Sequence, residues 1–331
     1  MIIVRTPFRV SFFGGGTDYP VWYRQYGGSV LGTTIDKYCY ISCRHLPPFF
    51  EYKHRLVYSH VELIKELSEI KHPAVRAVLQ TMGAPEGLEI HHDGDLPARS
   101  GLGSSSSFTV GLIHALTALK GNILAKRDLA SQAIHIEQEV LKEHVGSQDQ
   151  VLTTYGGFNK IDFLRDDSFV VTPIILSKER VAEFQNHMML FFTGFSRIAS
   201  EIAKTHIVNL ERKKKEMLAM NGMVDQAISI LQSKAPIEEF GGLLKKYWEF
   251  KRGLSDKVTT PDIDEIYQAG LDAGALGGKL LGAGGGGFML FFVKPEMQAR
   301  VREHLRRLVC VNFRIDYTGS KIVIYEPNNF Q

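Results

Sequence analysis

Hydrophobic residues follow two different spacings along this chain, and the clearest change between them lies around residue 100. Upstream of that point, residues 87–92 read as a short strand. Downstream, apolar side chains recur at helical spacing (Phe108, Leu112, Ala115, Leu116 and Leu119). The intervening residues 97–107 are rich in glycine and serine. We therefore predict a strand, a loop and a helix that begins among the serines.

The remaining sequence predicts helices and strands in mixed order. Strand-like stretches cover residues 1–13, 28–45 (with Asp36 and Lys37 between two strands), 169–176, 187–193, 288–293, 309–317 and 321–325. Helical spacing covers residues 63–79 (interrupted near Pro73), 127–143, 198–231, 237–252, 261–273 and 297–308. The charged residues 165–167 mark a domain boundary. We expect one domain over residues 1–167 and a second over residues 168–331.

The loop at residues 97–107 has the chemistry of a phosphate site. Gly101 and Gly103 let backbone N–H groups approach an anion without a Cβ in the way. The helix start adds unpaired N–H groups and a positive dipole end, and the serines add hydroxyl donors or a metal ligand. Neither Gly-Lys-Ser/Thr nor Gly-x-Gly-x-x-Gly is present. The alternative is a serine-rich cap on an ordinary helix.

A second glycine cluster lies near the N-terminus. Gly14, Gly15 and Gly16 predict a tight loop that brings backbone close to a ligand, with Asp18 just beyond it. A carboxylate beside open backbone is a natural acceptor for sugar hydroxyls. The alternative is a plain turn capped by Asp18.

Two acids stand out in the predicted helices that follow the phosphate loop. Glu137 falls in a row that is otherwise apolar (Ala130, Ile134, Leu141), where an uncompensated carboxylate is costly. It must be paired, metal-bound or at the edge of burial. Asp149 lies in the first turn of a short helix that Ser147 caps, either in a cleft near the phosphate loop or only complementing the helix dipole.

A third glycine cluster occupies residues 277–287, immediately before an apolar strand. So many glycines cost conformational entropy and favour disorder unless the loop packs against something. A loop that lies against the phosphate loop of the other domain would justify that cost.

Bulk properties exclude several classes of protein. A length of 331 residues suggests about two domains, and 44% hydrophobic content supports a sizeable core. A net charge of +3 is too small and too dispersed to indicate nucleic acid or an anionic membrane as partner. Three cysteines make no disulfide framework and fit a reducing compartment. With no signal peptide or long apolar run, we expect a cytoplasmic protein that is not membrane-bound.

The three glycine motifs, in this order, resemble those of the GHMP small-molecule kinases, which include galacto-, homoserine, mevalonate and phosphomevalonate kinases. The motifs are Arg9 with residues 14–19, residues 100–106 and residues 281–286, and the match extends from Arg5 to Phe292. The resemblance implies an α+β chain of two domains. The N-terminal domain would be like ribosomal protein S5 domain 2, and the C-terminal domain would be ferredoxin-like, with ATP between them.

The resemblance also implies roles for individual residues. Asp149 would accept or orient the proton of a sugar hydroxyl, and Arg9 would stabilise charge during transfer. Glu137 and a loop serine, Ser104, would hold Mg²⁺. The ATP phosphates would lie on the second and third motifs (Ser100, Gly101, Leu102, Gly103, Ser104, Ser105, Ser106, Gly284 and Gly285). The sugar would lie on the first motif (Gly15, Gly16, Thr17 and Asp18).

Within the family, the motifs most resemble those of the kinases that phosphorylate the anomeric hydroxyl of D-glycero-D-manno-heptose 7-phosphate, a step toward bacterial surface polysaccharides. Galactokinases carry Glu-His where this chain has Gly15 and Gly16, which argues against galactose. Two alternatives stay open. One is an anomeric kinase of a free sugar such as L-fucose or a hexosamine. The other is a catalytically silent sensor of sugar and ATP, which the presence of Arg9, Glu137 and Asp149 disfavours.

A sugar phosphate would need a cation for its distal phosphate. The sequence offers five candidates and does not choose among them (Arg24, Lys37, Arg44, Arg99 and Arg197). Arg99 stands where members of the family usually have a small residue. The expected ligands are thus a sugar phosphate and ATP with Mg²⁺, not nucleic acid, and a homodimer stays open.

Overall fold

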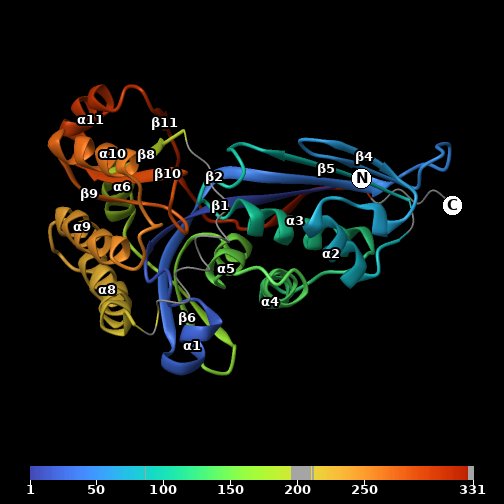
Figure 1. Ribbon diagram of the computed structural model, residues 1–331, viewed down its shortest axis with the longest axis horizontal. Coiled ribbons are helices and arrows are strands. Elements are labelled where there is room, and N and C mark those ends of the chain that lie inside the picture. Colours follow the sequence, from blue (N-terminus) through green and yellow to red (C-terminus); the bar gives the residue numbers. More distant parts are fainter. Residues whose placement is uncertain (86, 195–209, 211, 327–331) are drawn as a thin grey trace.

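The structure is a computed structural model, which describes residues 1–85, 87–194, 210 and 212–326. Figure 1 shows two lobes: a long sheet with helices beneath it, and a second sheet surrounded by helices at the other end of the molecule. Within the described residues, no helix combines the length and the apolar character that crossing a membrane requires.

The first sheet has nine strands. They are β1 (Ile2–Phe13), β2 (Gly28–His45), β3 (His54–Val57), β4 (Val61–Ile64), β5 (Leu88–Gly94), β6 (Phe158–Phe163), β7 (Phe169–Pro173), β12 (Ile315–Asp316) and β13 (Lys321–Tyr325). Six of them run in the order β13-β1-β2-β5-β3-β4, and β6, β7 and β12 are attached through β2. Strands β3 and β5 are parallel, whereas β1 and β2 form a long antiparallel pair.

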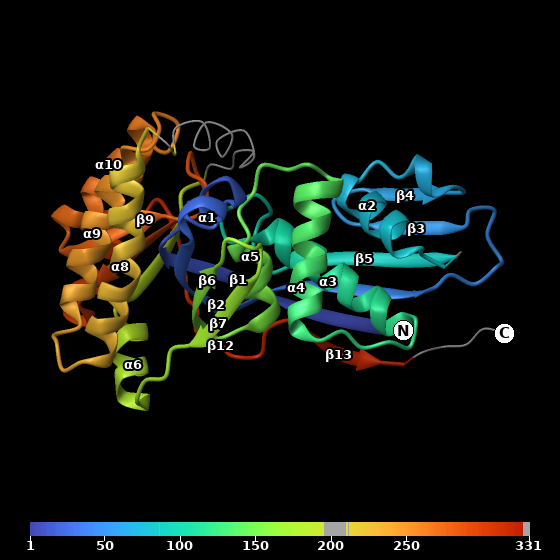
Figure 2. The same cartoon turned by 90° about the horizontal axis from the view of Figure 1, so that it is seen from below.

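Helices cover one face of this sheet. They are α2 (Pro73–Met82), α3 (Ser104–Leu119), α4 (Lys126–His135) continued by the π-helical turn η2 (Ile136–Val140), and α5 (Gln148–Tyr155). Figure 2 shows α3 and α4 beside one another across the sheet. Gly111 allows the close approach of α3, because a Cβ there would lie 3.0 Å from Thr6 Oγ1 and 3.2 Å from Ile41 Cγ1. The short helix α1 (Pro20–Tyr26) follows the first glycine cluster.

The second sheet has the antiparallel order β11-β8-β10-β9. Its strands are β8 (Met188–Phe192), β9 (Ala275–Leu280), β10 (Phe288–Val293) and β11 (Val309–Val311). Its helices are α6 (Lys178–Asn186), α8 (Lys214–Gln232), α9 (Glu238–Arg252), α10 (Pro261–Asp272) and α11 (Gln298–His304). Short turns of 3-10 helix precede α2 in the first lobe (η1, Leu67–Glu69) and α11 in the second (η3, Pro295–Met297). The mixed helix and sheet content confirms the predicted α+β class.

The two lobes share one aromatic cluster where they meet. The ring of Phe12 from β1 lies 5.4 Å from that of Phe184 on α6 and 5.7 Å from that of Phe240 on α9. Phe292 of β10 completes the cluster, 5.3 Å from the Phe240 ring. All four side chains are buried. Because burying aromatic surface is strongly favourable, this cluster holds the glycine loops of the two lobes in register.

The helix predicted over residues 63–79 is wrong in its first half. Residues 61–64 form β4 instead, with Val61 and Leu63 facing outward and Glu62 and Ile64 buried, which is strand periodicity. The helix α2 begins at Pro73, where proline is favoured because its missing N–H has no helical partner anyway. His72 caps it by accepting a hydrogen bond from the Val75 amide at 3.4 Å.

Other boundaries also differ from the prediction. Strand β2 continues through Asp36 and Lys37, which form a bulge because Ile35 pairs with Phe8 and Tyr38 pairs with Pro7. The first glycines of the third cluster lie in β9, so the loop itself covers residues 281–287. Of the helix predicted over residues 198–231, residues 214–231 lie in α8, and residues 195–209 and 211 lie outside the described part of the chain.

The two lobes are not consecutive halves of the chain. The predicted boundary after Asp167 lies in the turn between β6 and β7, and Phe169 pairs with Phe163 in the first sheet. The chain then builds the second sheet and returns, because β12 pairs with β2 and β13 pairs with β1. The aromatic cluster and this return together fix the lobes relative to one another.

Candidate functional site

The loop at residues 100–103 leads directly into α3, as the sequence predicts. Gly103 is the N-cap residue of α3, with φ +75°, a left-handed conformation that suits glycine. The amides of Ser104, Ser105 and Ser106 precede the first helical hydrogen bond, which runs from the Ser107 amide to the Gly103 carbonyl at 2.8 Å. Free amides at the positive end of a helix dipole favour the binding of an anion.

The glycine loop of the second lobe packs against this phosphate loop. A Cβ on Gly101 would lie 2.5 Å from the Leu281 carbonyl oxygen, and one on Gly287 would lie 2.2 Å from the Ser100 carbonyl oxygen. The Phe288 amide donates to that same Ser100 oxygen at 3.1 Å. The predicted contact between the two loops is therefore present, backbone against backbone, and glycine is what allows it.

The rest of the 281–287 loop packs against the Val258 carbonyl, in the segment between α9 and α10. A Cβ on Gly284, whose φ is +121°, would lie 2.6 Å from the Val258 carbonyl oxygen. The Gly285 amide donates to the same oxygen at 2.9 Å. Gly284 and Gly285 thus shape the loop through contacts with the segment between α9 and α10.

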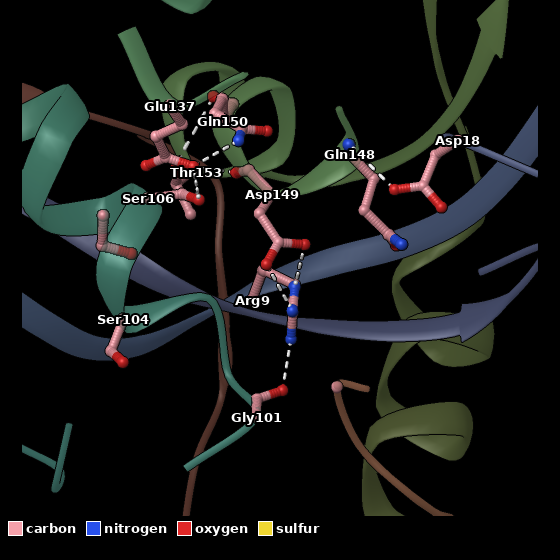
Figure 3. A network of polar contacts seen from close by, with 12 residues as sticks. Arg9, Asp18, Gly101, Ser104, Ser106, Glu137, Gln148, Asp149, Gln150 and Thr153 are labelled. Carbon is pink, nitrogen blue, oxygen red and sulfur yellow. Dashed lines mark hydrogen bonds and ion pairs between the residues drawn. The ribbon is translucent and has the colours of Figure 1, made fainter. Parts of the chain in front are cut away.

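Arg9 and Asp149 form a bidentate ion pair beside the phosphate loop. Arg9 Nε donates to Asp149 Oδ1 at 2.7 Å, and a second guanidinium nitrogen donates to Oδ2 at 2.5 Å. A third nitrogen donates to the Gly101 carbonyl (Figure 3). The Arg9 side chain is 5% exposed and that of Asp149 is 23% exposed. A buried guanidinium therefore connects the carboxylate to the phosphate loop and holds both in place.

Glu137 lies in η2, the π-helical turn that extends α4, and its side chain is buried. Its Oε2 atom accepts hydrogen bonds from Ser106 Oγ at 2.9 Å and from Gln150 Nε2 at 2.5 Å (Figure 3). Its Oε1 atom and the Gln150 Oε1 atom are buried without a partner in the described structure. Burial raises the pKa of Glu137 to about 7.

These unpartnered oxygens fit a hard cation. Mg²⁺ prefers oxygen ligands and is usually held by one or two carboxylates together with substrate phosphates and water. No group of three or more His, Cys, Asp or Glu side chains forms a metal site in the part of the chain that the structure describes. The residues present therefore suit a metal that arrives with ATP rather than a closed protein site.

The serine next to Glu137 is Ser106 and not Ser104. Ser104 Oγ accepts a hydrogen bond from the Arg99 amide at 3.1 Å, and Figure 3 shows its side chain directed away from Glu137. Residues two apart on a helix point about 200° apart around the axis, so only one of the two can face Glu137. The serine hydroxyl that contacts Glu137 is therefore that of Ser106, and the metal-binding role expected for Ser104 stays a prediction.

The first glycine cluster places Asp18 close to the same site. Asp18 is buried, and its Oδ1 and Oδ2 atoms accept hydrogen bonds from the amides of Gly16 and Gln148 at 2.9 and 3.3 Å. Burial raises its pKa above the usual value, and the nearby charge of Asp149 adds to this effect. The role expected for Asp18, to bind sugar hydroxyls, stays a prediction that this position near Asp149 supports.

The other expected sugar-binding residues, Gly15, Gly16 and Thr17, differ from one another in what surrounds them. Thr17 is engaged structurally, because its hydroxyl donates to the Gly14 carbonyl at 2.8 Å and accepts from the Ser29 amide at 3.1 Å. At Gly15, a Cβ would fit in ordinary van der Waals contact, 3.5 Å from Gln148 Nε2 and 3.6 Å from the Tyr247 hydroxyl. At Gly16, a Cβ would lie 3.1 Å from the Met217 methyl group of α8.

Most of the candidate cations for a distal phosphate are already paired. Arg24 binds Asp167, Lys37 binds Asp36 and Arg44 binds Glu89, at 2.6, 3.1 and 2.5 Å. Arg99 lies just before the phosphate loop with φ +58°, and its amide donates to Ser104 Oγ at 3.1 Å. Arg197 falls outside the described residues.

Sequence reasoning missed two buried lysines of the second lobe. Lys279 of β9 donates to the carbonyls of Ser11 and Phe12 in β1, both at 2.8 Å. Lys251 of α9 donates to the carbonyls of Leu280 and Gly282, at 3.1 and 2.6 Å. The signal was present: Lys251 ends the otherwise apolar helical row of α9 (Phe240, Leu244 and Tyr247), as Glu137 interrupts another such row.

Comparisons with known proteins place this fold and site in a family. The N-terminal domain of GHMP kinases matches residues 63–157, and the C-terminal domain of GHMP kinases matches residues 224–309. The D-glycero-alpha-D-manno-heptose 7-phosphate kinase of Campylobacter jejuni is 31% identical over 92% of this chain and 93% of its own length. A bifunctional fucokinase/GDP-fucose pyrophosphorylase of Arabidopsis thaliana is 24% identical over 91% of this chain, which spans 31% of that protein.

A solved structure has the same fold. The crystal structure of a D-glycero-D-manno-heptose 1-phosphate kinase from Bacteroides thetaiotaomicron superposes with a TM-score of 0.81 at 23% identity, covering 98% of this chain and all of that one. The two-domain architecture predicted from the motifs is thereby confirmed. With both domain matches and a relative of this identity and coverage, the chain belongs to the GHMP kinase family and is an ATP-dependent sugar kinase.

Proposed function

We propose that this protein transfers the γ-phosphoryl group of ATP to the anomeric hydroxyl of D-glycero-D-manno-heptose 7-phosphate, which gives the 1,7-bisphosphate. The named substrate of the Campylobacter jejuni relative supports the choice of sugar phosphate. The observation that carries the proposal is the bidentate Arg9–Asp149 pair, held between the phosphate loop and Asp18.

In this reaction the sugar hydroxyl oxygen attacks the γ-phosphorus and forms the new P–O bond, while the bond to the bridging oxygen of ADP breaks. The hydroxyl proton passes to Asp149, whose oxygens each keep a lone pair beside their bond from Arg9. An anomeric hydroxyl is more acidic than an ordinary alcohol, so a carboxylate suffices as base. Arg9 lies where charge develops on the transferred group.

The ATP phosphates would lie on the amides at the start of α3, between that loop and the 281–287 loop. Glu137 and Ser106 would hold Mg²⁺, with Gln150 orienting the carboxylate. Bound there, the metal supplies charge neutralisation on the phosphate oxygens. Asp18 would accept hydrogen bonds from the sugar hydroxyls, and the backbone of Gly15 and Gly16 would lie beside the sugar ring.

The experiment is a substrate panel with ATP and Mg²⁺: the heptose 7-phosphate, the free heptose, the heptose 1-phosphate, L-fucose and a hexosamine. Phosphorus NMR of each product locates the new ester. We expect turnover of the 7-phosphate at least ten times faster than that of the free heptose, with the new ester at the anomeric carbon. Comparable turnover of the two, or an ester elsewhere, would contradict the proposal.

The fucokinase relative favours one other candidate, an anomeric kinase of a free sugar. That candidate predicts faster turnover of L-fucose than of any sugar phosphate in the same panel. The third reading, a silent sensor, predicts ATP and sugar binding with no turnover of any member of the panel. The complete Arg9–Asp149 pair supports a catalyst over a sensor, because binding alone needs no base.

A further inference from the structure

Lys251 is a buried lysine on the inner face of α9, in the last turn of that helix. Its neighbours along the same face are aromatic, with the Trp248 ring 5.9 Å from its ammonium. An ammonium in such surroundings is costly unless its protons are bound. The Lys251 ammonium donates hydrogen bonds to the carbonyls of Leu280 and Gly282, at the point where β9 ends and the glycine loop begins.

These two carbonyls connect Lys251 to the catalytic pair through a short series of contacts. Gly282 lies against Gly101, because a Cβ on Gly282 would be 2.6 Å from the Gly101 Cα. The Gly101 carbonyl in turn accepts a hydrogen bond from Arg9, whose other nitrogens hold Asp149. The ammonium of Lys251 therefore fixes the loop that sets the position of the phosphate loop.

Charges of both signs face Lys251. Arg9 of β1 disfavours its ammonium form, and Asp18, in the loop after β1, favours it. The Lys251 ammonium in turn disfavours a charge on Lys279 of β9. Burial, with a smaller contribution from Arg9, lowers the pKa of Lys251 to about 7. A polyanion at the phosphate loop would stabilise the ammonium form, and the ammonium would stabilise the bound polyanion by the same amount.

We propose that Lys251 is a positioning residue for ATP: its ammonium holds the 281–287 loop against the phosphate loop and adds positive charge where the triphosphate binds. This rests on the proposed placement of ATP between the two loops. It does not depend on which sugar is the acceptor. We assign this role to Lys251 alone among the lysines of α9, because Lys245 and Lys246 are exposed.

The test measures binding of Mg²⁺-ATP by calorimetry, without sugar, to the full-length wild type and to three variants. Lys251→Met removes the charge, Lys251→Arg keeps it, and Lys246→Met is the matched control on the exposed face of the same helix. Losing a charged hydrogen bond typically weakens an interaction tenfold or more, so we expect Lys251→Met to bind about 10- to 100-fold more weakly. Lys246→Met should stay within about twofold of the wild type.

The dependence on pH provides a measurement that a purely structural lysine would not change. Wild-type affinity for Mg²⁺-ATP should fall between pH 7 and 9, as the Lys251 ammonium loses its proton in the unliganded protein. Lys251→Arg should bind with little dependence on pH in this range, because a guanidinium stays charged. If Lys251→Met fails to fold, as its melting curve would show, this comparison decides alone.

Three outcomes would overturn the inference: Lys251→Met binds like Lys246→Met, Lys251→Arg shows the same alkaline loss as the wild type, or the wild type shows no alkaline loss. These outcomes are distinct from a failure of the proposed function. That failure would appear as an absence of phosphoryl transfer to the heptose 7-phosphate, whatever the affinity for ATP.

Discussion

Gly101 and Gly282, which are 181 positions apart in the sequence, touch through their backbones at the junction of the two lobes. A Cβ on Gly282 would lie 2.6 Å from the Gly101 Cα, and one on Gly101 would lie 2.5 Å from the Leu281 carbonyl oxygen. The two glycine loops therefore form one continuous backbone surface, on which we propose that the phosphates of ATP bind.

The first prediction concerns Gly282→Ala. The new methyl group meets backbone that cannot rotate away, so the loops must separate. We expect KM for ATP to rise at least tenfold, while KM for the sugar changes by less than about threefold. Steady-state kinetics with each substrate varied in turn checks this.

Gly121→Ala is the matched control. Gly121 has the same φ of +73° as Gly282, but a Cβ there meets nothing within 4 Å. It therefore carries the cost of a left-handed alanine without the clash. Equal rises in KM for ATP in both variants would show that strain, rather than contact between the loops, is responsible.

The second prediction concerns the proton acceptor. Asp149→Asn keeps the shape and one acceptor oxygen beside Arg9 but removes the base. General-base catalysis contributes typically 10²- to 10⁴-fold, so we expect kcat to fall by about that factor. The affinity for Mg²⁺-ATP, measured by calorimetry, should stay within about fivefold. Asp167→Asn, which breaks the exposed pair with Arg24, should leave kcat unchanged. A kcat for Asp149→Asn near the wild-type value would remove Asp149 from the mechanism.

The third prediction concerns Glu137 and pH. Burial raises its pKa from 4.5 in the unfolded chain to about 7 in the folded protein without metal. The contribution of the protonated Glu137 side chain to the free energy of unfolding is therefore fully present below pH 4.5 and is lost as the pH rises through 7. Glu137→Gln is neutral throughout. Its free energy of unfolding, relative to the wild type, should increase by about 3 kcal/mol from pH 4.5 to pH 8.

Urea unfolding in the presence of a chelator measures this difference. Glu139→Gln, an exposed neighbour in the same π-helical turn, is the control and should show no such trend. Adding Mg²⁺-ATP at pH 8 should reverse the order and stabilise the wild type more, because an ionised carboxylate is the metal ligand. A difference that stays constant with pH would show that Glu137 is not a buried titrating acid.

The fourth prediction concerns Gly146, which packs against Asp18. A Cβ there would lie 1.9 Å from Asp18 Oδ2, so Gly146→Ala must displace the carboxylate. We expect KM for the sugar to rise about tenfold or more, while KM for ATP stays within about twofold. Gly222→Ala in α8, where a Cβ meets nothing within 4 Å, should change neither. A rise confined to KM for ATP would contradict the assignment of Asp18 to the sugar.

The sequence predicted the parts of the site that depend on local pattern. Gly101 and Gly103 lie where a loop must enter a helix, and an acid in an apolar helical row led to Glu137. It led to Ser104 beside Glu137, whereas Ser106 makes that contact, because the facing serine depends on where the first helical turn begins. A shift of two residues rotates a helical side chain to the opposite face.

Errors arose where local pattern and long-range pairing compete. Residues 61–64 carry apolar side chains compatible with a helix, but pairing with β3 makes them a strand. Lys251 was missed because a lysine at the end of a helix is usually a solvated cation. Its place at the end of the apolar row of α9 was the one sequence signal for burial, and the contact of α9 with the glycine loop explains it.

The pairing of β13 with β1 has a consequence for how this kinase is made. Ile2 and Ile3 lie opposite Tyr325 and Ile324, so β1 cannot complete its pairing until β13, far along the chain, has been synthesised. Such distant pairing slows folding and leaves a sheet edge uncovered in the meantime. A nascent chain that stalls before residue 321 therefore exposes the bare edge of β1 to other chains, and chaperone demand should be greatest at that moment.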